Sequence, residues 1–152
     1  MQDIFSNEAL GASIIAWALA QLAKAAIPLF NGKGFQARLL IGSGGMPSSH
    51  SAFVSGLAAA VAMIEGANSI GFAIAAVFAL VVMYDAAGVR RAVSQQAAIL
   101  NRIVQELKLK RPLTEMGVEL RELVGHTPFQ VIIGGAMGIA VAWVWVLVLK
   151  HQ

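Results

Sequence analysis

The chain has 152 residues, of which 58% are hydrophobic and only 12% are charged, with a net charge of +3 and a mean hydropathy of +0.73. Soluble domains carry about a quarter charged residues, so this composition indicates an integral membrane protein and excludes an ordinary soluble domain. The absence of cysteine excludes disulfides and thiolate metal sites. The length suits one domain of a few helices, and the first residues lack the basic region expected of a cleaved signal peptide.

Four apolar segments are predicted to form helices within the membrane. The first runs from Glu8 to Phe30 and is long enough to span a bilayer. It contains Lys24 near one end, where the ammonium group either reaches the interface or faces the protein interior. The second segment, from His50 to Ile64, is short for a span. The third runs from Ser69 to Tyr84, and the fourth from Pro128 to Leu149.

The fourth segment contains a pair of glycines, Gly134 and Gly138, on one helical face. Small residues four positions apart are typical of close helix packing in membranes. We therefore expect this face to pack against another helix, and it is our candidate face for a homo-oligomer.

A polar stretch, Asp85 to Gly125, separates the third and fourth segments. Between Val89 and Leu107 its apolar residues recur at spacings of four and three, which predicts an amphipathic helix. Such a helix either lies on the membrane surface or packs on the helical bundle. A second short helix is predicted from Thr114 to Gly125.

The basic residues indicate an orientation in the membrane. With four spans, the loops 31–49 and 85–125 emerge on one side, and both termini emerge on the other. Nine of the eleven basic residues lie in these two loops: Lys33, Arg38, Arg90, Arg91, Arg102, Lys108, Lys110, Arg111 and Arg121. The positive-inside tendency places that side in the cytoplasm. We expect the inner or plasma membrane of a bacterium, or an organelle membrane with the equivalent orientation.

Residues 42–50, with the sequence GSGGMPSSH, directly precede the second predicted helix. Glycines such as Gly45 let backbone N–H groups turn inward, and a helix start adds free donors and the positive end of a dipole. Ser48 and Ser49 add hydroxyl groups, and His50 can deliver a proton near neutral pH. These residue types suit a phosphate group. The alternative interpretation is a glycine-rich turn, capped by serine, before a membrane helix.

His126 lies at the start of the fourth predicted helix, on the same side of the membrane as His50. A single histidine at an interface is usually structural. Two histidines beside arginines and a glycine-rich turn can divide the cleavage of a phosphate ester, because one attacks phosphorus and the other protonates the leaving oxygen. A metal site is a poor alternative, because no histidine pair has the spacing of a helical zinc motif. Asp85 remains a candidate ligand for Mg²⁺, although it has no obvious carboxylate partner in the sequence.

Several runs of sequence resemble the type 2 phosphatidic acid phosphatase superfamily, which includes vanadium-dependent haloperoxidases. Residues 47–50, PSSH, resemble its Pro-Ser-Gly-His motif, and residues 126–131, HTPFQV, resemble its final motif. Residues 42–51, 83–90 and 125–128 are more specifically similar to a small divergent branch of bacteria and plants, described as acid phosphatase/vanadium-dependent haloperoxidase-related. The resemblance spans residues 24–142.

The resemblance implies roles for individual residues. His126 corresponds to the nucleophile that bonds phosphorus, His50 to the general acid, and Ser48 to a serine that donates to a phosphate oxygen. Ser49 replaces the glycine whose N–H contacts phosphate, and its backbone donor remains. Gln130 replaces the aspartate that orients the nucleophile, and its carbonyl can accept the Nδ1 proton but would stabilise an imidazolium less.

The basic phosphate ligands follow the superfamily pattern less closely. Arg121 lies five residues before the histidine, where the superfamily places its arginine six before. Arg90 is the rival ligand, because it belongs to another similar run. Lys33 and Arg38 are the candidates for the lysine and arginine of the superfamily's first motif, and Asp85 is a candidate supporting residue.

We therefore predict an all-α fold, a small integral membrane bundle of about four transmembrane helices plus an amphipathic helix in the long third loop. Residues 1–152 form a single phosphatase-like domain. The expected function is hydrolysis of a phosphomonoester or pyrophosphate of a phospholipid or polyprenyl lipid, without metal or cofactor, through a phosphohistidine.

The alternative function is a non-catalytic membrane protein that binds or moves a lipid phosphate with a relic site. Vanadate-dependent halide oxidation is a weaker third hypothesis, because the enzymes that perform it are large and soluble. The expected partners are the lipid phosphate and membrane lipids, and we expect no nucleic acid.

Overall fold

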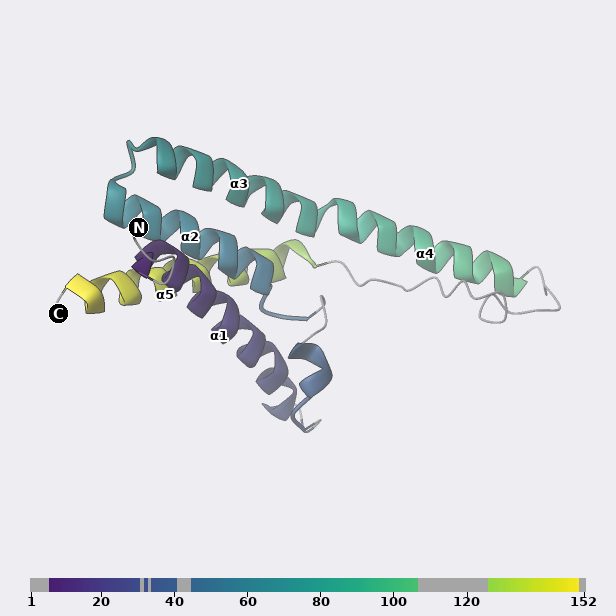
Figure 1. The fold of residues 1–152 in the computed structure, drawn as a ribbon. Helices are drawn as coiled ribbons and strands as arrows, with labels where there is room; N and C mark the ends of the chain where they lie inside the picture. The colour runs from purple at the N-terminus through teal and green to yellow at the C-terminus, as the bar shows by residue number, and fades with distance from the viewer. Residues whose placement is uncertain (1–5, 31, 33, 41–44, 107–125, 151–152) are drawn as a thin grey trace.

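The structure, a computed structural model of the chain, describes residues 6–30, 32, 34–40, 45–106 and 126–150. Within these ranges all regular structure is helical, which confirms the predicted all-α fold. The elements in chain order are α1 (Glu8–Phe30), the short 3₁₀ helix η2 (Ala37–Leu40), α2 (Ser49–Glu65), α3 (Ile70–Ala87), α4 (Val89–Glu106) and α5 (Pro128–Lys150) (Figure 1).

Short polar side chains begin three of these helices. Asn7 Oδ1 accepts a hydrogen bond from Leu10 N at 2.9 Å before α1, and Ser69 Oγ accepts one from Phe72 N at 3.0 Å at the start of α3. The N-cap of α2 is Ser48. Such caps satisfy backbone N–H groups that have no partner inside the helix. The boundaries predicted for α1 are confirmed, whereas α3 continues to Ala87 and so includes Asp85 in its last turn.

α2 lies at the centre of the bundle and packs against α1, α3 and α5. Its contacts with the other helices are made by small residues, so the backbones approach closely. A Cβ added at Gly138 would overlap the carbonyl oxygen of Ala52, and one added at Gly56 would lie 3.1 Å from the Cβ of Ala16. Ser55 Oγ lies 2.7 Å from the carbonyl oxygen of Ser51 and 2.9 Å from that of Gly135, and its single hydrogen is shared between the two acceptors.

The face with Gly134 and Gly138 is therefore filled within a single chain. Gly134 packs on the backbone of Ser48, and Gly138 packs on α2 one turn further along. This face was our candidate for contact with a second copy, and α2 occupies it instead. Formation of a homo-oligomer stays a prediction.

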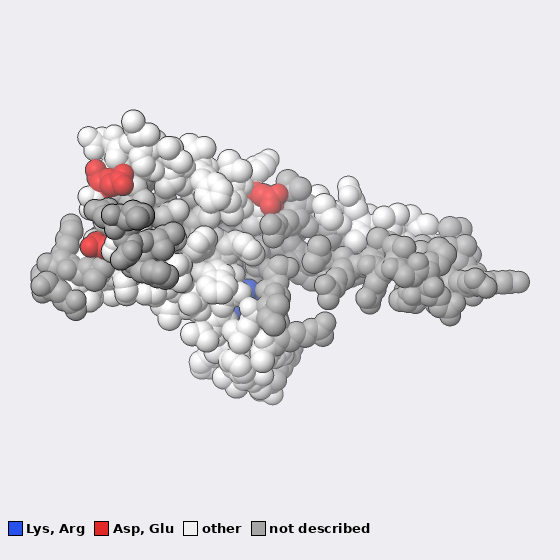
Figure 2. Space-filling model, in the orientation of Figure 1, with Lys and Arg blue, Asp and Glu red and all other residues white. Residues whose placement is uncertain are grey.

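The outer surface of the bundle is apolar. Ile74 and Ile132 are 67% and 63% exposed, and the part of the face in Figure 2 that is described carries few charged side chains. Among the described helices α1, α3 and α5 are long and apolar enough to cross a bilayer, and α2 is a shorter apolar helix of 17 residues. A surface of this kind suits lipid rather than water, so the protein is an integral membrane bundle of about four helices.

The two ends of the bundle differ. Figure 1 shows both chain termini at the same end as the turn between α2 and α3, and η2 and the start of α4 toward the other end. This arrangement agrees with the predicted topology, in which both termini lie on one side of the membrane and the loops 31–49 and 85–125 lie on the other. Which end faces the cytoplasm stays a prediction.

α4 forms where an amphipathic helix was predicted, and it continues from α3 beyond the bundle (Figure 1). Its main contact is with α3, and Val93, Leu100 and Ile103 are about half exposed on it. The alternative in which this helix packs on the bundle is therefore not what the structure shows. The predicted helix from Thr114 to Gly125 lies outside the described residues.

Candidate functional site

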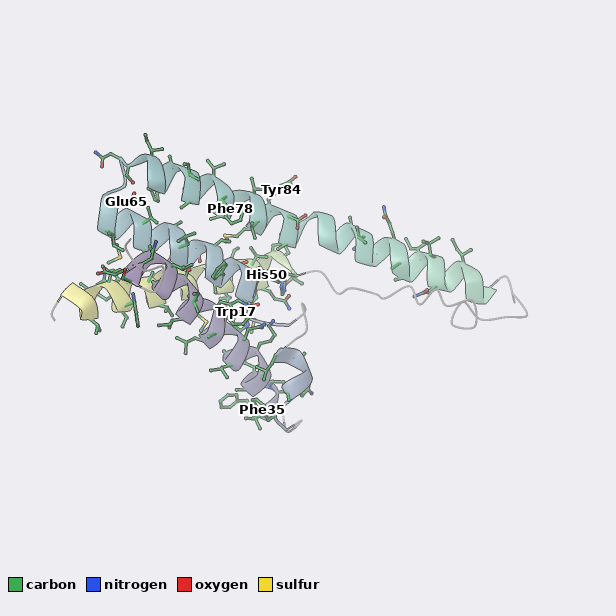
Figure 3. The ribbon with its side chains drawn as sticks, in the orientation of Figure 1. Trp17, Phe35, His50, Glu65, Phe78 and Tyr84 are labelled. Carbon is green, nitrogen blue, oxygen red and sulfur yellow. The ribbon has the colours of Figure 1, made fainter. Side chains whose placement is uncertain are left out.

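The candidate site lies where the amino-terminal ends of α2 and α5 meet. His50 is in the first turn of α2, at the end opposite Glu65 (Figure 3), and His126 lies two residues before α5 begins. The centroids of the two rings are 6.4 Å apart, and the ring planes are tilted by 57°. His126 is only 2% exposed, and His50 is half-buried. The two predicted catalytic histidines are therefore close enough to contact one phosphate group.

A backbone contact holds these two helix ends together. Ser48 N donates to the carbonyl oxygen of Gln130 at 3.2 Å, across the junction between α2 and α5. A Cβ at Gly134 would overlap the carbonyl oxygen of Ser48, so only glycine allows the chain to pass this close. The glycine on α5 thus permits the close approach of the two helix ends near which the histidines lie.

The side chain of Gln130 lies beside the ring of His126. Thr127 N donates to Gln130 Oε1 at 3.1 Å, which identifies that atom as the amide oxygen. The same oxygen lies 3.3 Å from His126 Nδ1. Because an amide oxygen only accepts, we assign the hydrogen of the neutral ring to Nδ1, which leaves a lone pair on Nε2. This geometry suits the orienting role expected of Gln130.

The first turn of α2 presents the donors expected of an anion site. Ser48 is fully buried, and its Oγ accepts from Ser51 N at 3.3 Å and from Ser51 Oγ at 3.0 Å. The Ser48 hydroxyl therefore caps the helix, and its own hydrogen is a donor for a further group. The N–H groups of Ser49 and His50 lie in the first turn, where backbone donors and the helix dipole favour an anion.

Lys24 is a site residue that our sequence analysis did not select. This lysine of α1 is 1% exposed, and its Nζ donates to Gln21 Oε1 at 2.6 Å and lies 3.5 Å from Ser49 Oγ. Its aliphatic chain runs beside Gly45, whose φ of +95° favours glycine and where a Cβ would lie 3.0 Å from Lys24 Cγ. A buried positive charge thus lies beside the start of α2.

A sequence signal for Lys24 existed. An ionisable residue inside an apolar span is by default a functional-site hypothesis. The resemblance instead suggests Lys33, in the loop after α1, as the lysine of the first motif.

The structure describes only some of the remaining site residues predicted from the sequence. Arg38 lies in η2 and Arg90 in α4, and only their backbones are described. Lys33 and Arg121 lie outside the described residues. Asp85 is half-buried in the last turn of α3.

Two further features are the result for metal-binding groups and an open groove on α3. In the parts of the chain that are described, no group of three or more His, Asp or Glu side chains could hold a metal ion. Asp85 also borders an open groove of about 670 Å³, together with Leu80, Val81, Met83 and Tyr84.

Comparison with known proteins supports the resemblance seen in the sequence. The family model described as the Divergent PAP2 family matches residues 5–141. The protein described as the uncharacterized membrane protein YuiD, from Bacillus subtilis strain 168, is 36% identical over an alignment of 146 positions, and the match covers 90% of this chain and 92% of that protein. No solved structure matches. Because the family match includes α1, α2, α3 and both site histidines, the chain belongs to the Divergent PAP2 family of membrane proteins.

Proposed function

We propose that this protein is a membrane phosphatase that hydrolyses a phosphomonoester or pyrophosphate of a phospholipid or polyprenyl lipid. The observation that carries the proposal is the pairing of His126 with His50 at a centroid distance of 6.4 Å, beside the start of α2. Membership of the Divergent PAP2 family supports phosphatase-related chemistry.

In the first step, Nε2 of His126 attacks the terminal phosphorus, and the bond from this phosphorus to its leaving oxygen breaks. His50, in its protonated form, gives its proton to that oxygen, so a phosphomonoester releases a lipid alcohol and a pyrophosphate releases a lipid monophosphate. Gln130 accepts from Nδ1 of His126 and keeps Nε2 turned toward the phosphate. The product of this step is a phosphohistidine and a neutral His50.

In the second step, His50 takes a proton from a water molecule, which attacks phosphorus as the bond to Nε2 breaks. Inorganic phosphate leaves, and both histidines return to their starting states. The backbone N–H groups of the first turn of α2 and the ammonium group of Lys24 offset the negative charge in both steps. Each of these contacts requires a separation of roughly 3 Å when substrate is bound.

The position of the site favours a lipid substrate. The site lies at one end of an apolar bundle, where the phosphate head groups of a leaflet are concentrated. The open groove beside Asp85 is lined mainly by apolar side chains of α3 and lies toward the same end of the bundle. A lipid chain in this groove would stay in an apolar environment while its phosphate reached the histidines.

The second candidate function is binding or movement of a lipid phosphate without hydrolysis. Gln130 is the observation that favours it, because a neutral amide stabilises an imidazolium less than a carboxylate would. Under this hypothesis the same residues hold the phosphate, and no bond to His126 forms.

Phosphate release from a panel of lipid phosphates by the purified protein tests the two candidates. Wild type is expected to release phosphate from at least one lipid, and His126→Ala is expected to release none. His151→Ala, a substitution of the histidine that the proposal does not use, is the control and should match wild type. Lipid phosphate binding without release in wild type would establish the second candidate in place of the first.

A further inference from the structure

We propose that Gln21 is a positioning residue, which holds the Lys24 ammonium group at the phosphate site without neutralising it; this inference rests on the proposed anion site. Gln21 lies three residues before Lys24 on α1, at a spacing that brings side chains onto one helix face. Nothing in the residue patterns or in the family resemblance assigns it a role.

Both the oxygen and the nitrogen of the Gln21 side-chain amide form hydrogen bonds. Oε1 accepts from Lys24 Nζ at 2.6 Å, and Nε2 donates to the carbonyl oxygen of Leu40 at 2.9 Å. Lysine has only donors and a carbonyl has only acceptors, so this orientation of the amide is the one that satisfies both partners. Gln21 therefore joins a buried cation to the last residue of η2.

This connection bears on the site because η2 lies shortly before the glycine-rich turn in the chain. Gln36 N donates to the carbonyl oxygen of Ala25 at 3.2 Å and gives a second tie between α1 and this segment. The four-carbon stem of Lys24 passes Gly45, and its ammonium group ends 3.5 Å from Ser49 Oγ. A lysine stem is flexible, so a fixed acceptor at Gln21 limits where the charge can lie.

The neutrality of the amide is the second part of the inference. A buried ammonium group is costly unless it is hydrogen-bonded, and the usual partner for it is a carboxylate. A glutamate at position 21 would hold the Lys24 side chain equally well but would cancel its charge. Glutamine accepts one hydrogen bond from the ammonium group without adding a negative charge, so the positive charge of Lys24 is not cancelled by its partner at position 21.

Binding of orthovanadate, a phosphate analogue, to the purified full-length protein tests this inference without requiring turnover. Gln21→Glu is expected to weaken the affinity about tenfold or more, because charged hydrogen bonds contribute at this level. Gln96→Glu on α4 adds the same charge at an exposed position and is the matched control. Its affinity for vanadate should equal that of wild type.

A double-mutant cycle separates positioning from a general structural role. Gln21→Met should weaken vanadate binding in the presence of Lys24 and should have no further effect in Lys24→Met, because Gln21 acts through Lys24. Independent effects of the two substitutions would overturn the inference. A lower unfolding temperature of Gln21→Met with unchanged vanadate affinity would also overturn it. If Gln21→Met does not fold, the near-isosteric Gln21→Glu still decides the question.

The outcomes for this inference and for the proposed function differ. If wild type binds vanadate and the double-mutant cycle gives the expected result, but wild type releases no phosphate from any lipid phosphate, the role of Gln21 is supported and the proposed phosphatase activity is refuted. If wild type hydrolyses lipid phosphates and the KM of Gln21→Glu equals that of Gln96→Glu, the proposed phosphatase activity stands and the role of Gln21 is overturned. A wild-type protein that does not bind vanadate overturns the inference as well.

Discussion

Gly134→Ala is expected to separate the two helix ends that carry the histidines. The new methyl group would overlap the carbonyl oxygen of Ser48, and both partners belong to rigid backbone, so α2 and α5 must move apart. Overpacking of this kind costs about 1–3 kcal/mol. The movement also strains the hydrogen bond from Ser48 N to the Gln130 carbonyl, which contributes about 1 kcal/mol. We expect a loss of stability of about 2–4 kcal/mol.

Activity should fall further than stability alone explains. A shift of about 1 Å between reacting groups can cost roughly 100-fold in rate. The neighbouring Gly135→Ala is the matched control, because its methyl group would meet the flexible end of Met83 at 3.1 Å. Thermal unfolding in detergent and phosphate release, measured for both variants, provide the comparison. If Gly134→Ala has the unfolding temperature and activity of wild type, the close contact between Ser48 and α5 does not exist and our account of the site is wrong.

Three further predictions concern chemistry and orientation. His50→Ala should slow a lipid phosphate by about 100-fold or more and largely spare a substrate with an acidic phenol as leaving group, since such a group needs no proton; equal losses for both substrates would argue against the acid role. Gln130→Asp should raise the rate of phosphate release if charge behind His126 limits it, whereas an unchanged rate would show that orientation suffices. Cysteines introduced at Asn7 and Gln95, both exposed, should be labelled from opposite sides of the membrane, and labelling from one side would contradict four passes.

Local patterns in the chain were enough to predict most of the helices. The apolar run from Glu8 to Phe30 coincides with α1, and the periodicity after Val89 predicts α4, because helix formation depends on neighbouring residues. The family was also predictable from the two histidine motifs, and the comparisons confirm it. Composition alone established the membrane environment, since a chain with 12% charged residues cannot cover a soluble surface.

Only the tertiary structure decided which faces of these helices meet. Lys24 and Ser49 are 25 residues apart, and no local pattern indicates that α1 brings the ammonium group to the start of α2. Gly134 and Gly138 have a spacing that suits contact with any helix, so the sequence could not distinguish α2 from a second copy. The same holds for α4, whose amphipathic pattern is compatible with either a lipid surface or the bundle. Helix propensity acts along the chain, whereas the choice of partner depends on packing between distant residues, and the geometry of the candidate site follows from that packing.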